Sequence, residues 1–388
     1  MQTPHTFYKW ARTAQPIFFD EASGYWVLTK YDDVKKVLRN EAYFSAELER
    51  VNYEEICPHA RAILEPINFQ ELYGLSTTEN PNHDKVKAVL MPILHELFYK
   101  TLKPQVENLI YHEVLRLKGM KVVNIAKELF YHLPAEIVFT ILGVPSQDIP
   151  KIKEWTKSRM VLTWGPAREQ TSHAANIVRY WKYTQELLRS KAKHPGNDLP
   201  SKLIEAEKAG QLTRLDIELL CYGLIFSGHT TTSTFLTESL KTMLYTDVWS
   251  QIIEEDYPFI YTVDELLRLC PSAFTRRRIV KKDFTVRDHT FTKGSKLLLV
   301  IGSANRDEEV FAAPDELILA RPNSNKHLTL GSGFHYCIGA KIVKLEYATV
   351  MRCLADVFPD MILSGRNTFE YESNISIRAL RSLYVNLY

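Results

Sequence analysis

Residues 331–340 read Gly-Ser-Gly-Phe-His-Tyr-Cys-Ile-Gly-Ala, a glycine-punctuated loop that presents one cysteine and then turns into an amphipathic helix. A cysteine held at a helix N-terminus has its thiolate favoured by the helix dipole and by nearby backbone N–H groups. Such a thiolate is a good metal ligand, so the pattern predicts a metal–thiolate site at Cys337. For an arbitrary cysteine a buried free thiol is more common than a metal ligand. Motifs elsewhere in the chain must therefore distinguish these two interpretations of Cys337.

This loop resembles the haem-binding signature of the cytochrome P450 family, FxxGxxxCxG. Gly333, Cys337 and Gly339 match it, whereas Leu330 stands at the position of the aromatic residue. The resemblance implies that Cys337 is the axial ligand of a haem b iron, where a thiolate pushes electron density toward dioxygen. It also implies that Gly331, Gly333 and Gly339 let the backbone lie close to the macrocycle, and that His335 reaches a propionate.

Upstream of the loop, Glu265-Leu266-Leu267-Arg268 resembles the ExxR pair of the family. Residues three apart on a helix share a face and can form an ion pair. Arg321, in Leu319-Ala320-Arg321-Pro322, stands at the position of the third partner. The resemblance therefore implies a buried network of Glu265, Arg268 and Arg321, which is costly to break from either side.

The resemblance also places residues against the haem carboxylates. Among the three arginines 276–278, the spacing to Asp283 favours Arg278, whose guanidinium fork suits a carboxylate. In the segment 80–87, His83 matches a histidine of the family, and Lys87 replaces the arginine four residues later. For His83, a polar residue in the first turn of a helix is the alternative interpretation.

The mostly apolar run 219–240 is broken by Ser227-Gly228-His229-Thr230-Thr231-Thr232. Threonine side chains can bond carbonyls of the preceding turn, so we expect a local distortion of a long helix here. By resemblance Gly228 and Thr231 match the oxygen-activating segment, and Thr231 is the oxygen-activating threonine. Thr230 occupies the position where the family usually has an acid, so the acid expected to relay protons is missing.

The 388 residues include 48 basic and 46 acidic side chains, for a net charge of +2, which gives no reason to invoke nucleic acid. The N-terminus has neither a signal peptide nor an apolar run long enough to span a bilayer, so we expect a cytoplasmic protein without a membrane anchor. Cys57, Cys221, Cys270 and Cys353 lack paired spacing, which makes a disulfide framework or a zinc site unexpected. Cys221, Cys270 and Cys353 are expected to be packing residues.

Hydrophobic periodicity predicts one mainly helical domain over residues 1–388 with small sheets. The resemblance implies the cytochrome P450 fold, a triangular helical prism with haem between a long distal helix and the helix after the cysteine. The expected elements are a strand at 25–28; helices at 31–39, 83–97, 103–117, 134–142, 147–161, 173–194, 199–209, 214–246, 263–269 and 337–358; and a hairpin of strands 281–292 and 295–300 turning at 292–294.

The function implied is a monooxygenase that uses O2 on a small or medium organic substrate, free or carried by another protein, in secondary metabolism. Electrons would come from NAD(P)H through a ferredoxin or flavodoxin and its reductase, docking near Lys341, Lys344 and Arg352. A peroxide-using or isomerising haem-thiolate enzyme and a non-catalytic haem or ligand-binding protein remain as alternatives. The pocket residues expected by resemblance are apolar or aromatic, with core packing as the alternative for each: Tyr222, Ile225, Phe226, Phe274, Trp164 and Ile375.

Overall fold

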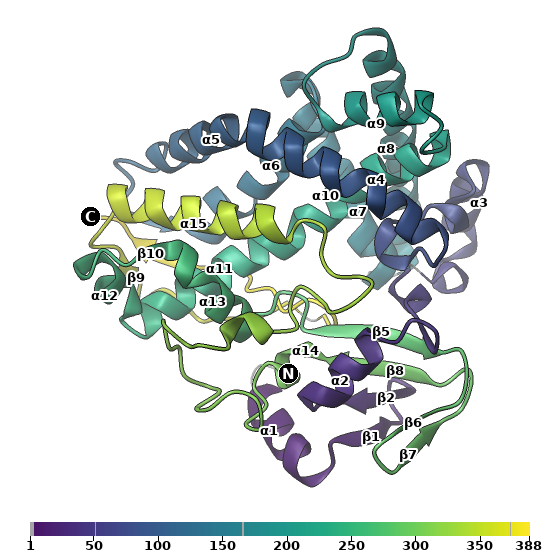
Figure 1. Ribbon diagram of the computed structural model, residues 1–388. Coiled ribbons are helices and arrows are strands. Elements are labelled where there is room, and N and C mark those ends of the chain that lie inside the picture. The colour runs from purple at the N-terminus through teal and green to yellow at the C-terminus, as the bar shows by residue number, and fades with distance from the viewer. Residues whose placement is uncertain (1–3, 51, 165–166, 373) are drawn as a thin grey trace. The chain divides into compact units, whose positions relative to one another are not determined.

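The computed structural model describes residues 4–50, 52–164, 167–372 and 374–388, and it is mainly helical with small sheets (Figure 1). The helices are α1 (Pro4–Ala14), α2 (Tyr31–Leu38), α3 (Pro58–Leu64), α4 (Asn82–Leu97), α5 (Lys103–Leu115), α6 (Leu133–Ile141), α7 (Ile149–Trp164), α8 (Ala167–Lys193), α9 (Leu199–Lys208), α10 (Arg214–Gly228), α11 (Thr230–Tyr245), α12 (Val248–Glu254), α13 (Val263–Leu269), α14 (Ile301–Ala304) and α15 (Ala340–Val357). The strands are β1 (Ile17–Asp20), β2 (Tyr25–Leu28), β3 (Phe44–Ser45), β4 (Val122–Asn124), β5 (Thr275–Val280), β6 (Phe284–Val286), β7 (His289–Phe291), β8 (Lys296–Val300), β9 (Ile362–Leu363) and β10 (Tyr384–Asn386).

The chain forms two compact units that alternate along the sequence. The first unit comprises residues 1–46, 110–133 and 231–388, and the second comprises residues 47–109 and 134–230. The long helical run 214–245 is divided between them, since α10 belongs to the second unit and nearly all of α11 to the first.

A five-stranded sheet in the order β1-β2-β8-β5-β3 organises one end of the first unit. Strand β8 is central: it pairs parallel with β2 and antiparallel with β5. Its residues 297–300 are all buried, as expected for a strand covered on both faces. One face packs on α2 and on residues that follow β8, including Val34, Leu38, Ile301 and Phe311.

The helical part of the first unit is built around α13 and α15. Tyr347 of α15 is fully buried; its ring lies 5.4 Å from that of Phe235 of α11, and its hydroxyl lies 2.7 Å from the Thr262 hydroxyl. Thr262 immediately precedes α13. These contacts hold α11, α13 and α15 together in one apolar layer, and they fix the direction in which α15 leaves the cysteine loop.

The second unit is organised by α8, which contacts α3, α7, α9 and α10. Helix starts follow local capping rules. Thr213 and Asp216 form a reciprocal capping box at α10, and Asp198 accepts a hydrogen bond of 2.9 Å from the Ser201 N–H at α9. These caps satisfy backbone donors that the helices themselves leave open.

Most expected elements are confirmed, with boundaries shifted by a few residues, but two predictions need correction. The helix expected over 214–246 is interrupted at His229, where the predicted distortion ends α10 and begins α11. The hairpin of strands 281–292 and 295–300 is wrong. Residues 284–286 and 289–291 pair with each other instead, while β8 pairs with β2 and β5. Strand β5 was not predicted because its three consecutive arginines do not give an apolar pattern. It pairs with β8 because the two strands share the core.

Candidate functional site

The cysteine loop has a defined backbone geometry. Gly331 and Gly333 adopt φ of 80° and 74°, values that residues other than glycine rarely adopt. The Cys337 N–H donates to the Leu330 carbonyl at 2.9 Å, and the Ala340 N–H donates to the Cys337 carbonyl at 3.3 Å. The loop therefore closes on itself and places Cys337 just before the N-terminus of α15.

Gly333 is required for a second reason, because α2 approaches it closely. A Cβ at this position would lie 3.0 Å from the Arg39 Cα atom, closer than side chains normally tolerate. Gly339 differs: its φ is −86°, and a Cβ there would meet only the Cys337 sulfur among the described atoms, at 3.9 Å. The absent side chain at Gly339 thus leaves space beside the sulfur.

The cysteines differ in their suitability as a metal thiolate. Cys221 and Cys270 are buried, and this burial raises the pKa of the Cys221 thiol and brings the pKa of Cys270 to about 11. Such thiols stay protonated and inert. Cys337 is only partly buried, lies beside a helix N-terminus and has space next to its sulfur. The residues present therefore fit a haem-thiolate group at Cys337.

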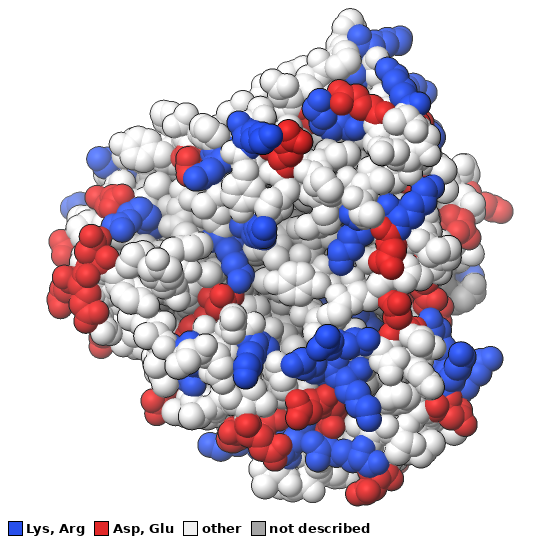
Figure 2. Space-filling model, viewed as in Figure 1, with Lys and Arg blue, Asp and Glu red and all other residues white. Residues whose placement is uncertain are grey.

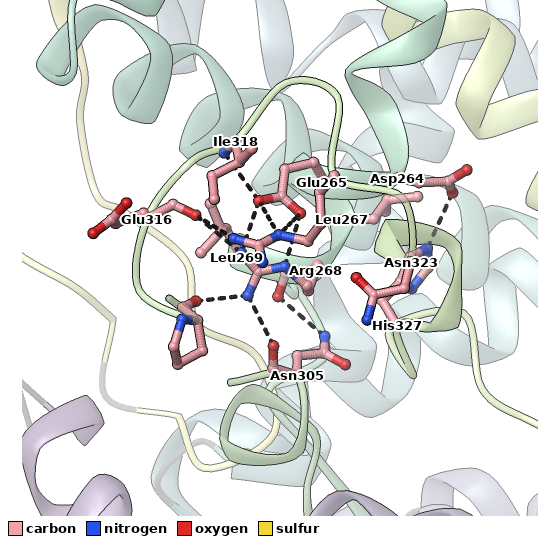
Figure 3. Close-up of polar contacts among 12 residues, drawn as sticks. Asp264, Glu265, Leu267, Arg268, Leu269, Asn305, Glu316, Ile318, Asn323 and His327 are labelled. Carbon is pink, nitrogen blue, oxygen red and sulfur yellow. Dashed lines mark hydrogen bonds and ion pairs between the residues drawn. The ribbon is translucent and has the colours of Figure 1, made fainter. Parts of the chain in front are cut away.

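Glu265 and Arg268 lie in direct contact (Figure 3), and Arg321 also binds the Glu265 carboxylate. Arg268 donates from Nε and Nη2 to the two Glu265 oxygens, both at 2.8 Å, and Arg321 Nε lies 2.9 Å from Glu265 Oε1. Glu265 and Arg268 are fully buried. Burial alone would raise the pKa of Glu265, but the two guanidinium groups outweigh it and lower the pKa.

The same arginines hold the chain that leads to the cysteine loop. Arg268 donates to the carbonyls of Asn305, Pro314 and Glu316 at 2.6–3.1 Å. Arg321 also donates to the carbonyls of Ala313 and Glu316. The ion network thus supplies donors to an irregular backbone segment that lacks secondary-structure hydrogen bonds.

Asn305 links this segment to the start of the cysteine loop. The side-chain N–H group of Asn305 donates to the Thr329 hydroxyl at 2.8 Å, and its side-chain oxygen Oδ1 accepts a hydrogen bond from the Leu328 N–H at 2.7 Å. The Thr329 hydroxyl donates to the Leu267 carbonyl at 2.5 Å. All four residues are buried, so the loop begins from a fixed point on α13.

The distal segment is interrupted where the sequence predicted. Thr230 and Thr231 are the first two residues of α11, and both are half-buried, whereas His229 is buried. Gly228 ends α10, and a Cβ there would lie 2.7 Å from Cγ2 of Val138 in α6, within the second unit. Close helix packing therefore accounts for glycine at 228, and a role in oxygen binding is a separate proposal.

The residues expected at the haem carboxylates are distributed over both units. Arg278 of β5 is 6% exposed, and His335 lies in the cysteine loop; both belong to the first unit. His83 and Lys87 lie in the first two turns of α4 in the second unit. His83 is 2% exposed, and its burial lowers its pKa, a shift that the neighbouring Asp84 opposes.

Several residues expected to line a pocket have contacts typical of core packing. Tyr222 stacks on Tyr180 of α8 at 5.0 Å and lies 5.2 Å from Phe226, and Ile225 is buried beside them on α10. Phe274 packs with Val27, Leu298 and Val300. Ile375 is 41% exposed, and the side chain of Trp164, the last residue of α7, lies outside the described part of the chain.

Sequence reasoning missed Asp264 and His327, which lie beside the ion network (Figure 3). The Asp264 carboxylate binds His327 and also Lys344 of α15. Lys344 was also expected to dock a redox partner, and that expectation stays a prediction; the structure adds the ion pair with Asp264. Arg352 is likewise bound to Asp256 at 3.2 Å, whereas Lys341 is exposed.

On the face shown in Figure 2, acidic and basic side chains alternate with uncharged areas. Within the described ranges, no helix is both long and apolar enough to cross a bilayer. The same residues contain no cluster of three or more His, Cys, Asp or Glu side chains placed to hold a metal ion.

Comparisons with known proteins show the family of the chain. The family model described as Cytochrome P450 matches residues 261–358, which include α13 and the cysteine loop. The solved structure of cytochrome P450 CREJ in complex with (4-ethylphenyl) dihydrogen phosphate has a TM-score of 0.93 and 31% identity, and the match covers 100% of this chain and 98% of that one.

Two further relatives are similar over most of their length. The haem domain of CYP116B5 from Acinetobacter radioresistens has a TM-score of 0.89 and 28% identity, with 100% and 95% of the two chains covered. The polyketide biosynthesis cytochrome P450 PksS of Bacillus subtilis (strain 168) is 27% identical over 366 residues, covering 93% of this chain and 89% of the relative. The chain therefore belongs to the cytochrome P450 family and is a haem-thiolate monooxygenase, an oxidoreductase.

Proposed function

We propose that the protein inserts one atom of dioxygen into a small or medium organic substrate, by hydroxylation or epoxidation, with haem b held by Cys337. The observation that carries the proposal is the cysteine loop. In it a partly buried thiol lies just before α15 and follows two glycines with positive φ, Gly331 and Gly333. Electrons would come from NAD(P)H through a separate ferredoxin or flavodoxin system. We also propose that the two units act as one domain.

Four side chains are proposed to bind the haem carboxylates: Arg278, His335, His83 and Lys87. When bound, the haem supplies the reductive activation of dioxygen, and the thiolate of Cys337 increases its electron density. The chain's own contribution is to orient the thiolate, exclude water and deliver protons.

Thr231 is proposed to deliver protons through a water that its hydroxyl holds. The hydroxyl can donate and accept hydrogen bonds at once, so it can orient a water without storing a charge. Thr230, one position earlier in α11, lies about 100° away around the helix. Thr231 therefore acts without the acid that usually precedes it in the family.

The ligand assignment is tested with Cys337→Ser. Reduced wild-type protein under carbon monoxide should show the red-shifted absorption band of thiolate ligation, and Cys337→Ser should lose it. Cys353→Ser, which changes a partly buried cysteine on the same helix region, serves as the matched control. A band that survives in Cys337→Ser would refute the assignment.

The proton relay is tested by coupling. Thr231→Ala should continue to consume NAD(P)H while product falls and peroxide rises, and Thr230→Ala should change coupling much less. The alternative of a peroxide-using enzyme is motivated by the missing acid at Thr230. It becomes the better conclusion if Thr231→Ala leaves coupling unchanged and wild-type protein turns over with peroxide alone. A haem or ligand-binding protein without activity would fail both turnover assays.

A second candidate substrate class, aromatic phosphates, is favoured by Arg50. Its guanidinium stacks on the Tyr73 ring at 3.6 Å, and Nη2 donates to the Thr77 carbonyl at 2.9 Å. Its Nε atom is buried without an acceptor among the described residues. A guanidinium held in this way is a good phosphate donor, and the related CREJ structure contains (4-ethylphenyl) dihydrogen phosphate.

This candidate is tested by titrating the ferric protein with 4-ethylphenyl phosphate and with 4-ethylphenol, following the haem absorption spectrum. Tighter binding of the phosphate in wild-type protein, lost in Arg50→Gln but kept in the nearby Arg61→Gln, would support it. Equal affinities for the two compounds would rule out phosphate recognition by Arg50, and uncharged substrates would remain the proposed class.

A further inference from the structure

One carboxylate oxygen binds the chain on both sides of Cys337. Asp264 Oδ1 lies 3.2 Å from His327 Nε2, ten residues before the cysteine, and 2.5 Å from Lys344 Nζ, seven residues after it. The His327 side chain is 4% exposed and that of Lys344 is 27% exposed. Asp264 is the second residue of α13, the helix that also carries the buried ion network.

The hydrogen bonds determine which nitrogen of His327 carries the proton. The Thr329 N–H donates to Nδ1 at 3.2 Å, so Nδ1 must present a lone pair. Nε2 therefore carries the hydrogen and donates it to Asp264. Burial lowers the pKa of His327, which agrees with a neutral ring held in this tautomer.

The carboxylate remains charged in this setting. Burial alone would raise the pKa of Asp264, but the hydrogen bonds from His327 and Lys344 outweigh that effect and lower the pKa to about 2. Asp264 thus accepts one neutral and one charged donor over the whole pH range in which the protein would work. Hydrogen bonds that involve an ionised group are the stronger kind.

The two bonds restrain the loop between them. From His327 the chain passes to Thr329 and Leu330, whose carbonyl accepts the Cys337 N–H at 2.9 Å. From Cys337 it enters α15, whose first turns carry Lys344. Movement of either end of this segment relative to α13 must break a bond to Asp264.

We propose that Asp264 is a positioning residue that clamps both sides of the thiolate-bearing loop and thereby fixes the direction of the Cys337 sulfur. This role rests on the proposed thiolate ligation, and it concerns residues outside the cysteine loop itself. It also assigns Lys344 to loop positioning rather than to partner docking.

The test compares Asp264→Asn with Asp256→Asn by hydrogen exchange of the purified full-length protein. Asp256 is the matched control because it binds Arg352 of the same helix α15, away from the loop. Loss of a charged hydrogen bond should speed exchange in residues 328–337 about tenfold in Asp264→Asn. Exchange of α8 should stay unchanged, and Asp256→Asn should match wild type throughout.

A second pair of variants keeps the proposal testable if Asp264→Asn does not fold. Lys344→Gln should also speed exchange of the loop, whereas Lys344→Arg should restore the wild-type rate because it keeps the ion pair. Under carbon monoxide, Asp264→Asn and Lys344→Gln should lose part of the red-shifted thiolate band during mild urea treatment that leaves wild type unchanged.

Loop exchange in Lys344→Gln equal to that in Asp256→Asn would overturn the clamp. A failure of the proposed function has a different signature: the thiolate band would be missing in wild-type protein while the exchange differences between variants persist.

Discussion

Glu346 is a buried acid without a charged partner in the described part of the chain, and it makes folding stability depend on pH. It lies on α15, is 4% exposed, and its Oε1 atom has no hydrogen-bond partner among the described residues. Burial raises the pKa of its carboxyl group from 4.5 to about 8. Between these values the folded protein holds a proton that the unfolded chain has released.

The sign follows from proton linkage. Because the folded state binds more protons than the unfolded state between pH 4.5 and 8, the free energy of unfolding falls as pH rises through this range. Each pH unit corresponds to about 1.36 kcal/mol. The wild-type carboxyl therefore costs about 3 kcal/mol at pH 7 and reaches a limit of about 5 kcal/mol above pH 8.

Glu346→Gln removes the titrating group and keeps the side-chain shape. We expect the variant to be more stable than wild type by an amount that grows by about 1.4 kcal/mol per pH unit from pH 5 to 8 and then levels off. The assay is urea unfolding of both proteins at several pH values, followed by circular dichroism. Asp356→Asn, an exposed carboxylate on the same helix, is the control and should show no such trend.

A stability difference that does not change with pH would refute this reasoning, because it would mean that Glu346 does not titrate between pH 5 and 8. A Glu346→Gln variant that is less stable than wild type at pH 8 would refute it more directly. In that case the ionised carboxylate must have a partner that stabilises it in the folded protein.

Three other changes have defined expected outcomes. Gly333→Ala should destabilise the protein by about 1–3 kcal/mol in urea unfolding because of its φ of 74° and the Arg39 backbone at 3.0 Å, whereas Gly24→Ala, with φ of 71° and open space, should cost about 1 kcal/mol; equal losses would contradict the steric argument. Arg321→Ala should cost about 3–5 kcal/mol in the same assay because it leaves part of the Glu265 charge unpaired in the interior, and a loss below 1 kcal/mol, as expected for an exposed pair, would contradict this. Lys341→Glu should slow reduction by an acidic ferredoxin, with the difference from wild type shrinking as salt is added, and rates insensitive to both changes would remove Lys341 from the docking surface.

Part of the fold could be predicted because it depends on short-range patterns. The helix expected at 263–269 has the bounds of α13, and the strand expected at 25–28 has those of β2. The partners of β8 could not be predicted. Strand β2 lies about 270 residues before it and β5 about 20 residues before it, and burial rather than a short turn brings them together. The hairpin 284–291 formed instead because its own turn is local.

For the site, the shape of the Cys337 loop could be predicted, since positive φ at Gly331 and Gly333 and the helix that follows are local consequences of residue type. How that loop is held depends on contacts between segments far apart in the chain. That His327 and Lys344 share one oxygen of Asp264 depends on three segments meeting in space, and each residue alone would be an ordinary polar side chain. Charges become partners only through distance and burial, which no local pattern encodes.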